Sequence, residues 1–181
     1  LADPRPMLAT DESIDKLNGK DWAFEGKWDG YRILVRYIDG EFRLTSRSGI
    51  IMTEDFPELH SVADDLGLLD VVLDGEVVAI DSTGRTNFSL LTARNTTTEP
   101  YDLKLYLFDI LYLNGTSLVG TPWSSRRELL DELAPEALLD PGPVALEDLA
   151  RHQGGDVGVL AQAQHAGPHR LVGDRDGTAA P

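Results

Sequence analysis

Three apolar runs between residues 22 and 47 constrain the fold of this chain, because short turn signals separate them. The runs cover residues 22–28, 31–38 and 41–47, and Asp-Gly dipeptides follow the first two at positions 29–30 and 39–40. Short runs rich in aromatic and β-branched residues and bounded by such turns are typical of half-buried strands. The sequence therefore predicts an antiparallel sheet in this part of the chain.

The rest of the chain up to residue 134 alternates in the same way between strand-like and helix-like patterns. Further strands are predicted at residues 71–80 and 103–113, and helices at residues 57–69, 88–94 and 124–134. This order predicts an α+β domain in which helices flank antiparallel sheets.

Two of these elements carry local signals of their own. Ser124 or Ser125 can cap the last helix, whose apolar face holds Leu129, Leu130 and Leu133. The Asn-Gly pair at residues 114–115 predicts a turn directly after the strand at 103–113.

Composition fits one domain with a substantial core, since the chain has 181 residues and is 41% hydrophobic. It has no cysteine, which excludes disulfides and cysteine-ligated zinc. No apolar stretch approaches 18 residues, and no secretion signal begins at Leu1. We therefore expect a soluble cytoplasmic protein that does not bind membranes.

The net charge of −15 argues against strong autonomous binding to nucleic acid, which needs a clustered basic face. A local patch is predicted on the two strands joined by the turn at residues 39–40. It would consist of Arg32, Arg36, Arg43 and Arg47. The alternative is an outer sheet face on which these arginines pair with acids. Any affinity for DNA should then be weak and sensitive to salt.

Lys27 is the candidate nucleophile, because it ends one apolar run just before the next begins. An amine attacks only in its uncharged form, whereas a free lysine side chain has a pKa of about 10.4. The role therefore requires partial burial or a nearby cation, including a metal ion. The alternative is an ordinary surface lysine whose charged end reaches solvent.

Four segments in order resemble the motifs of the covalent nucleotidyltransferases, which include ATP-dependent DNA ligases, RNA ligases and capping enzymes. The start, Pro6-Met7-Leu8-Ala9, and residues 88–91 are most similar to the bacterial ligases of non-homologous end joining. The four segments are Lys27-Trp28-Asp29-Gly30-Tyr31-Arg32, Ser46-Arg47-Ser48-Gly49, Leu73-Asp74-Gly75-Glu76-Val77-Val78, and residues 105–115 with Phe108-Asp109 at their centre. The resemblance covers roughly residues 1–150 and implies the ATP-grasp-like fold of the DNA ligase and capping-enzyme nucleotidyltransferases.

The resemblance implies roles for individual residues. Lys27 would attack the α-phosphate of ATP, release pyrophosphate and hold AMP through a phosphoramidate bond. Glu25 would help to recognise adenine, Arg32 and Glu76 would bind the ribose hydroxyls, and Phe108 would stack on the adenine ring. Such roles suit the chemistry of these side chains, because a guanidinium donates, a carboxylate accepts and stacking needs a rigid π surface.

Other positions would support the pocket or contact nucleic acid. Arg47 matches an arginine that contacts the phosphates of nicked DNA, for which a fork of donors is well suited. Asp29, Gly30 and Asp109 would support the pocket. The resemblance also implies Mg²⁺, whose ligands the sequence does not identify.

Each assignment has an ordinary structural alternative when its residue is taken alone. Glu76 could be a charged residue after a hairpin turn, and Phe108 could be a core aromatic. Arg47 could be an exposed cation at the end of a strand. The ordered combination of motifs favours the functional reading.

The C-terminal part departs from the family pattern. The family continues with Glu-Gly-x-x-x-Lys, whose best counterpart here begins at Val157 and ends at Gln162, so both functional side chains are missing. Valine offers no oxygen ligand to Mg²⁺, and glutamine carries no full positive charge. The following Lys-x-Lys motif is absent too, because Lys104 is the last lysine of the chain.

We therefore predict an adenylation domain over residues 1–150 and a divergent, disordered tail over residues 151–181. The tail would reflect either a shifted reading frame or true divergence. We also expect no oligonucleotide-binding domain, which makes the chain too short for a complete ligase.

The sequence is consistent with three functions. The leading one is a truncated adenylation domain of an ATP-dependent DNA ligase, which would seal nicked or broken DNA in repair and recombination alongside DNA-repair proteins. The second is a non-catalytic relative that still binds an adenine nucleotide or a repair partner. The third is an RNA ligase or capping-type transferase.

Overall fold

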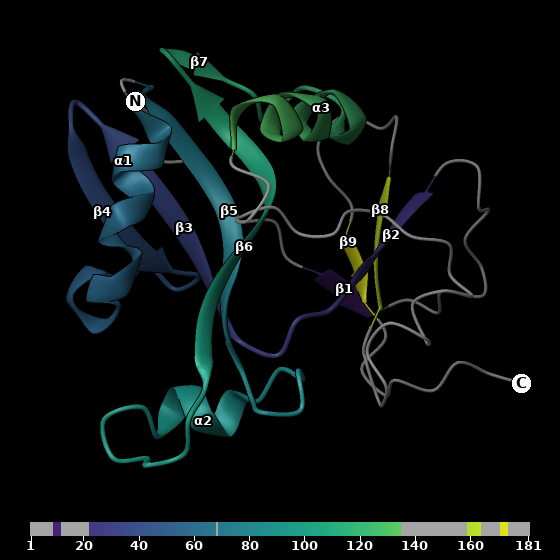
Figure 1. Ribbon diagram of the computed structural model, residues 1–181. Helices are drawn as coiled ribbons and strands as arrows, with labels where there is room; N and C mark the ends of the chain where they lie inside the picture. The colour runs from purple at the N-terminus through teal and green to yellow at the C-terminus, as the bar shows by residue number, and fades with distance from the viewer. Residues whose placement is uncertain (1–8, 12–21, 68, 135–158, 164–170, 174–181) are drawn as a thin grey trace, which may run out of the picture.

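The computed structural model describes residues 9–11, 22–67, 69–134, 159–163 and 171–173, which form two sheets (Figure 1). The larger, five-stranded sheet is antiparallel throughout. Its strands, in spatial order, are β4 (Glu41–Ser46), β3 (Tyr31–Ile38), β5 (Val71–Ile80), β6 (Asp102–Leu113) and β7 (Thr116–Ser117).

The second sheet has four strands and includes the N-terminal strands. Its order is β1 (Ala9–Asp11), β9 (Leu171–Gly173), β8 (Val159–Ala163) and β2 (Trp22–Gly26). The β1 and β9 pair is parallel, whereas the other pairs are antiparallel. The sheets are therefore antiparallel, as predicted, except at this one pair.

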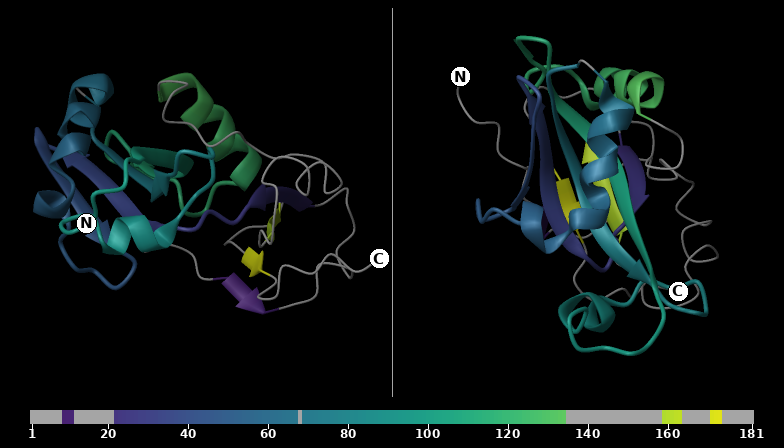
Figure 2. Two further views of the ribbon diagram at one scale, coloured as in Figure 1. Left: turned by 60° about the horizontal axis from the view of Figure 1, so that its bottom comes forward. Right: turned by 60° about the vertical axis from the view of Figure 1, so that its left-hand side comes forward.

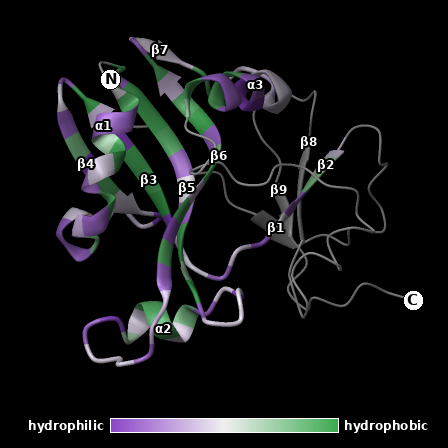
Figure 3. Cartoon of the chain, in the orientation of Figure 1, coloured by the Kyte–Doolittle hydropathy of each residue, from purple (hydrophilic) through white to green (hydrophobic). Residues whose placement is uncertain are grey.

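Side-chain alternation gives the large sheet one strongly apolar face. On β5, Val71, Leu73, Val77 and Ala79 are buried in the main core, and the apolar strands are visible in Figure 3. Successive side chains of a strand point to opposite faces, so the residues between them face away from this core. Short helical segments pack residues into the core: η3 (Pro57–Ser61), α1 (Val62–Leu66) and α2 (Phe88–Thr92).

Two of the three predicted turns are confirmed as hairpin turns. Asp39 and Gly40 have φ angles of 52° and 78°, and Asn114 and Gly115 have φ angles of 43° and 90°. Two successive positive φ angles are the requirement of the tight hairpin turn that Asp-Gly and Asn-Gly favour. These turns connect β3 to β4 and β6 to β7.

The third predicted turn, at residues 29–30, has a different structural role. It does not pair the strands on either side of it, because β2 belongs to the four-stranded sheet and β3 to the five-stranded one. A Cβ atom at Gly30 would lie 2.1 Å from the carbonyl oxygen of Val77. Glycine is therefore needed here so that the connection between the sheets can lie against β5.

The helices partly match the sequence prediction. The segment predicted as one helix over residues 57–69 is divided between η3 and α1, which ends before Gly67, and α2 stops at Thr92. Helix α3 (Trp123–Leu133) lies against β6, and Figure 2 shows it from two further directions. Its cap was predicted wrongly, since its N-cap is Pro122 and no side chain caps it.

The structure also differs from the expectation of a disordered tail, because β8 and β9 lie in the second sheet. Strand β8 runs antiparallel to β2, with Leu160 opposite Glu25 and Val159 opposite Gly26. The boundary predicted after residue 150 lies outside the described residues. No helix in the described ranges is long and apolar enough to cross a membrane.

Candidate functional site

A cleft of about 600 Å³ lies where the chain passes from β2 to β3. Its lining joins segments far apart in sequence, including every predicted nucleotide-binding residue. The lining residues are Glu25, Gly26, Lys27, Trp28, Asp29, Gly30, Tyr31, Arg32, Ser46, Arg47, Ser48, Ile50, Met52, Asp55, Glu76 and Phe108.

Arg32 and Glu76 reach the cleft through strand alternation. They lie directly opposite each other on β3 and β5. Their neighbours Ile33 and Val77 are fully buried in the main core. Because alternate side chains point to opposite faces, Arg32 and Glu76 face away from the core.

Phe108 reaches the cleft through an irregularity in β6. Gly75 pairs with Leu107 and Asp74 pairs with Asp109, so that Phe108 is an extra residue without a direct partner on β5. Such a β-bulge changes the direction of a side chain, and bulges are common beside functional sites. The guanidinium carbon of Arg32 lies 5.5 Å from the centre of the Phe108 ring.

Glu76 is a half-buried carboxylate with an unusual environment. Burial raises its pKa to about 7, while Arg32 and a hydrogen bond from the Gly30 amide act in the opposite direction. Asp74 also raises the pKa, and Lys27 lowers it. The carboxylate is thus placed to accept hydrogen bonds in a site that water reaches poorly.

Arg32 is held by Asp74 through two hydrogen bonds. Nε donates to Oδ1 at 3.0 Å and Nη2 donates to Oδ2 at 2.8 Å, and the Asp74 side chain is 2% exposed. Burial lowers the pKa of Arg32, but its attraction to Asp74 and the hydrogen bonds between them raise the pKa overall. Arg32 therefore stays charged in a fixed orientation at the edge of the cleft.

The segment that carries Lys27 is fixed on both sides. The centre of the Trp28 ring lies 4.4 Å from the centre of the Tyr106 ring. The Asp29 carboxylate accepts a hydrogen bond of 3.3 Å from the Phe88 amide at the start of α2. Lys27 itself is exposed, so among the described residues it lacks the partial burial expected of a nucleophilic lysine.

Arg47 and Glu25 lie at different depths in the cleft. Glu25 is 3% exposed at the end of β2. Arg47 is exposed in the turn after β4, where the Ser46 hydroxyl accepts a hydrogen bond of 3.0 Å from the Ile50 amide. Both residues line the same cleft as Lys27.

Asp109 was predicted to support the pocket, but it does not line the cleft. It is 4% exposed and binds Arg126 of α3 through two hydrogen bonds of 2.7 Å. Sequence reasoning missed Arg126 and the partner function of Asp74. The signal for Arg126 was its position between Trp123 and Leu130, at helical spacing on the buried face of α3.

The predicted basic patch takes a mixed form. Arg36 and Arg43 are cross-strand partners, and alternation places them on the same face as Arg32. Arg32 forms an ion pair with Asp74, and Nη2 of Arg43 lies 3.9 Å from Oε2 of Glu41. Arg47 is the member of the patch that also lines the cleft while being exposed.

The comparisons with known proteins agree with this arrangement. Residues 4–147 match the family model described as the ATP-dependent DNA ligase domain. The multifunctional non-homologous end-joining DNA repair protein LigD of Mycobacterium tuberculosis is 43% identical over 164 residues, which cover 87% of this chain and 21% of that protein. A DNA ligase of Thermoplasma volcanium is 35% identical over 142 residues, covering 72% of this chain and 24% of that protein.

Solved structures give the same result. A mycobacterial DNA ligase D in complex with ATP and MES matches with a TM-score of 0.79 and 37% identity, covering 94% of this chain and 59% of that chain. The ligase domain of M. tuberculosis LigD matches with the same score and identity over 58% of its length. The predicted fold is thus confirmed, and the chain spans about a fifth of the LigD proteins it matches.

Proposed function

This chain belongs to the ATP-dependent DNA ligase domain family, and from that membership we propose that it adenylates itself at Lys27 as the first step of DNA ligation. The observation that carries the proposal is the shared cleft. Lys27, Arg32, Glu76 and Phe108 come from three separate parts of the sequence and line one concave site of about 600 Å³. A cleft of this size is within the range of small-molecule and cofactor sites.

The proposed first half-reaction takes place at this lining. The uncharged amine of Lys27 attacks the α-phosphorus of ATP, a nitrogen–phosphorus bond forms, and the bond to the bridging oxygen breaks as pyrophosphate leaves. The amine proton passes to solvent, to which Lys27 is exposed. Two cationic side chains, Arg32 and Arg47, line the same cleft as this amine.

The nucleoside would be held by groups deeper in the cleft. Glu76 would accept hydrogen bonds from ribose hydroxyls, and Arg32 would donate to a ribose oxygen beside it. Phe108 would stack on the adenine ring, with Glu25 reading an adenine edge. Asp29 and Gly30 support this arrangement, because they attach the Lys27 segment to α2 and β5.

The later steps would transfer AMP to a 5′-phosphate and seal the break by attack of a 3′-hydroxyl. Arg47 would contact phosphates of the nicked strand, since it is exposed and lines the same cleft as Lys27. We propose that residues 1–150 form the adenylation domain and that nicked or broken DNA is the substrate. DNA-repair proteins would be partners of the larger ligase.

Mg²⁺ would enter with ATP. Magnesium keeps several waters and usually binds through one or two carboxylates together with substrate phosphates. The described ranges contain no group of three or more His, Cys, Asp or Glu side chains that could hold a metal ion, so no preformed cage is assigned. When bound, the cation would neutralise charge on the phosphates and on the leaving pyrophosphate.

A second candidate is a nucleotide-binding relative without transferase activity. The observation that favours it is the segment matched to Glu-Gly-x-x-x-Lys, which has Val157 and Gln162 at the two functional positions. The described part of that segment pairs with β2, where Val159 lies opposite Gly26, the residue before Lys27. The charged groups that the family pattern has at residues 157 and 162 are thus missing from the sequence.

One experiment separates the two candidates. The purified chain is incubated with α-labelled ATP and Mg²⁺, separated under denaturing conditions and mapped by peptide, with Lys27→Ala in parallel. Label on the Lys27 peptide that is lost in the variant would support the ligase half-reaction. Saturable ATP binding without label, in folded protein, would favour the non-catalytic relative.

A further inference from the structure

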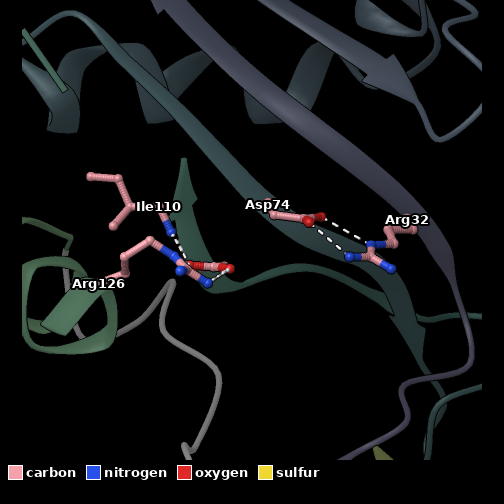
Figure 4. Close-up of polar contacts among 5 residues, drawn as sticks. Arg32, Asp74, Ile110 and Arg126 are labelled. Atoms are coloured by element: carbon pink, nitrogen blue, oxygen red, sulfur yellow. Dashed lines mark hydrogen bonds and ion pairs between the residues drawn. The ribbon is translucent and has the colours of Figure 1, made fainter. Parts of the chain in front are cut away.

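Four charged side chains form a row across the large sheet, from the cleft to α3 (Figure 4). In order they are Arg32 on β3, Asp74 on β5, Asp109 on β6 and Arg126 on α3. Asp74 and Asp109 are direct cross-strand partners. We name this row the charge quartet.

Each carboxylate of the charge quartet is matched by one guanidinium. Asp74 accepts two hydrogen bonds from Arg32, and Asp109 accepts two from Arg126, the latter at 2.7 Å each. Arg126 is 0% exposed and also donates to the Thr121 carbonyl. The quartet is therefore neutral as a whole, as buried charges must be if they are to stay ionised.

The two ion pairs are not independent. Asp109 acts on Arg32 as well as on Asp74, raising the pKa of both alongside the larger effects of burial and of the direct pair. The positive charge of Arg126 balances the negative charge of Asp109. Among the described residues, Arg126 is the ion-pair partner of Asp109, so its loss would leave two adjacent carboxylates competing for Arg32.

We propose that Arg126 is a positioning residue for the nucleotide site, acting through Asp109 and Asp74 on Arg32. Arg126 itself does not line the cleft, whereas Arg32 does. By balancing the charge of Asp109, it allows the guanidinium of Arg32 to stay paired with Asp74 in the orientation seen at the cleft. The consequence for ATP rests on the function proposed above, but the orientation of Arg32 does not.

The test is a charge-balance series. Arg126→Met removes the distant cation, and Arg126→Met/Asp109→Asn removes the unbalanced carboxylate as well. Arg127→Met is the matched control, because Arg127 is a buried arginine of the same helix that pairs with Asp131 at 2.9 Å, outside the quartet. Each protein is titrated with ATP, and the Nε–H resonance of Arg32 is followed in ¹⁵N-arginine spectra.

Arg126→Met should weaken ATP binding on the order of tenfold and shift the Arg32 resonance, because coupling within one charged network is of that size. The double variant should recover both readouts, and Arg127→Met should change neither. An Arg32 resonance unmoved by Arg126→Met overturns the proposal. So does a double variant as impaired as the single one, since that outcome assigns Arg126 a purely structural function.

The series also separates this inference from the proposed function. A wild-type chain that binds no ATP would contradict the nucleotide site. If the Arg32 resonance then still moved in the single variant and returned in the double one, positioning by Arg126 would stand.

Discussion

Arg32 and Glu76 face each other across β3 and β5, and both side chains line the cleft. The pair places a donor and an acceptor side by side on rigid strands, on the side of the sheet opposite the main core. Burial nevertheless acts against the ionised form of Glu76, whose pKa is about 7. A group that we propose binds the nucleotide therefore lowers the free energy of unfolding at neutral pH.

Glu76→Gln should stabilise the protein at high pH. Below about pH 4.5 the carboxyl is protonated in both the folded and the unfolded state, so it has no effect on stability. As the pH rises towards 7, the unfolded chain ionises first and the free energy of unfolding falls. The difference between variant and wild type should grow to about 3 kcal/mol at pH 8, from the pKa shift towards about 7.

Denaturant unfolding at pH 4.5, 6 and 8 measures this difference. Glu99→Gln, a change at an exposed carboxylate, is the control and should show no such trend. If Glu76→Gln raised the free energy of unfolding equally at all three pH values, the raised pKa of Glu76 would be contradicted. ATP binding by the variant should fall despite the gain in stability.

Gly75→Ala should destabilise the sheet by roughly 1–3 kcal/mol, the usual range for overpacking. An added Cβ would lie 2.6 Å from the Tyr106 carbonyl oxygen and 3.1 Å from the Leu107 side chain. The backbone oxygen cannot move without separating β5 from β6. Thermal unfolding checks the effect against Gly120→Ala, where an added Cβ meets nothing within 4 Å. Equal melting temperatures for the two variants would exclude the close approach.

Phe108→Leu should weaken ATP binding by about 1–3 kcal/mol, the usual contribution of a base stacked on an aromatic ring. Stability should change little, because Phe108 is half-buried. Calorimetric titration with ATP measures the loss. Phe42→Leu is the matched control, since it changes a half-buried aromatic of β4 that does not line the cleft. A similar loss of affinity in both variants would rule out stacking on Phe108.

Arg47→Ala should leave the labelling of Lys27 intact and weaken binding to nicked duplex DNA. Losing one phosphate contact should reduce the dependence of log affinity on log salt by about one. Titrations at several salt concentrations give this slope, with Arg85→Ala, a change in an exposed loop, as control. An unchanged slope in Arg47→Ala would remove Arg47 from the nucleic-acid site.

Much of the larger sheet could be predicted from the sequence. The bounds of β3 and β5 were predicted correctly, because their apolar runs end at clear turn residues. The start of α3 was not, because Pro122 holds its N-cap position without a side-chain hydrogen bond. Local preferences favour the serines, but the packing of Trp123 begins the helix earlier.

The sequence was sufficient to predict which residues line the cleft, but not which side chains contact one another around it. Family resemblance selected Lys27, Arg32, Glu76 and Phe108, which lie together. The charge quartet depends on contacts between residues far apart in sequence, such as Asp109 with Arg126 on another element. A sequence pattern does not show which buried carboxylate pairs with which arginine, so Asp109 could be predicted only as a residue that supports the pocket.

The bulges of β6 give this domain a specific vulnerability to deletions. Strand β6 carries two residues, Phe108 and Leu111, that have no direct partner on β5. If one residue were deleted between 105 and 107, Phe108 could move into the ladder opposite Gly75 and restore regular pairing. The ring would then point to the core face. Such a gene product would keep the pairing of β5 with β6 but lose from the cleft the ring that we propose stacks on adenine.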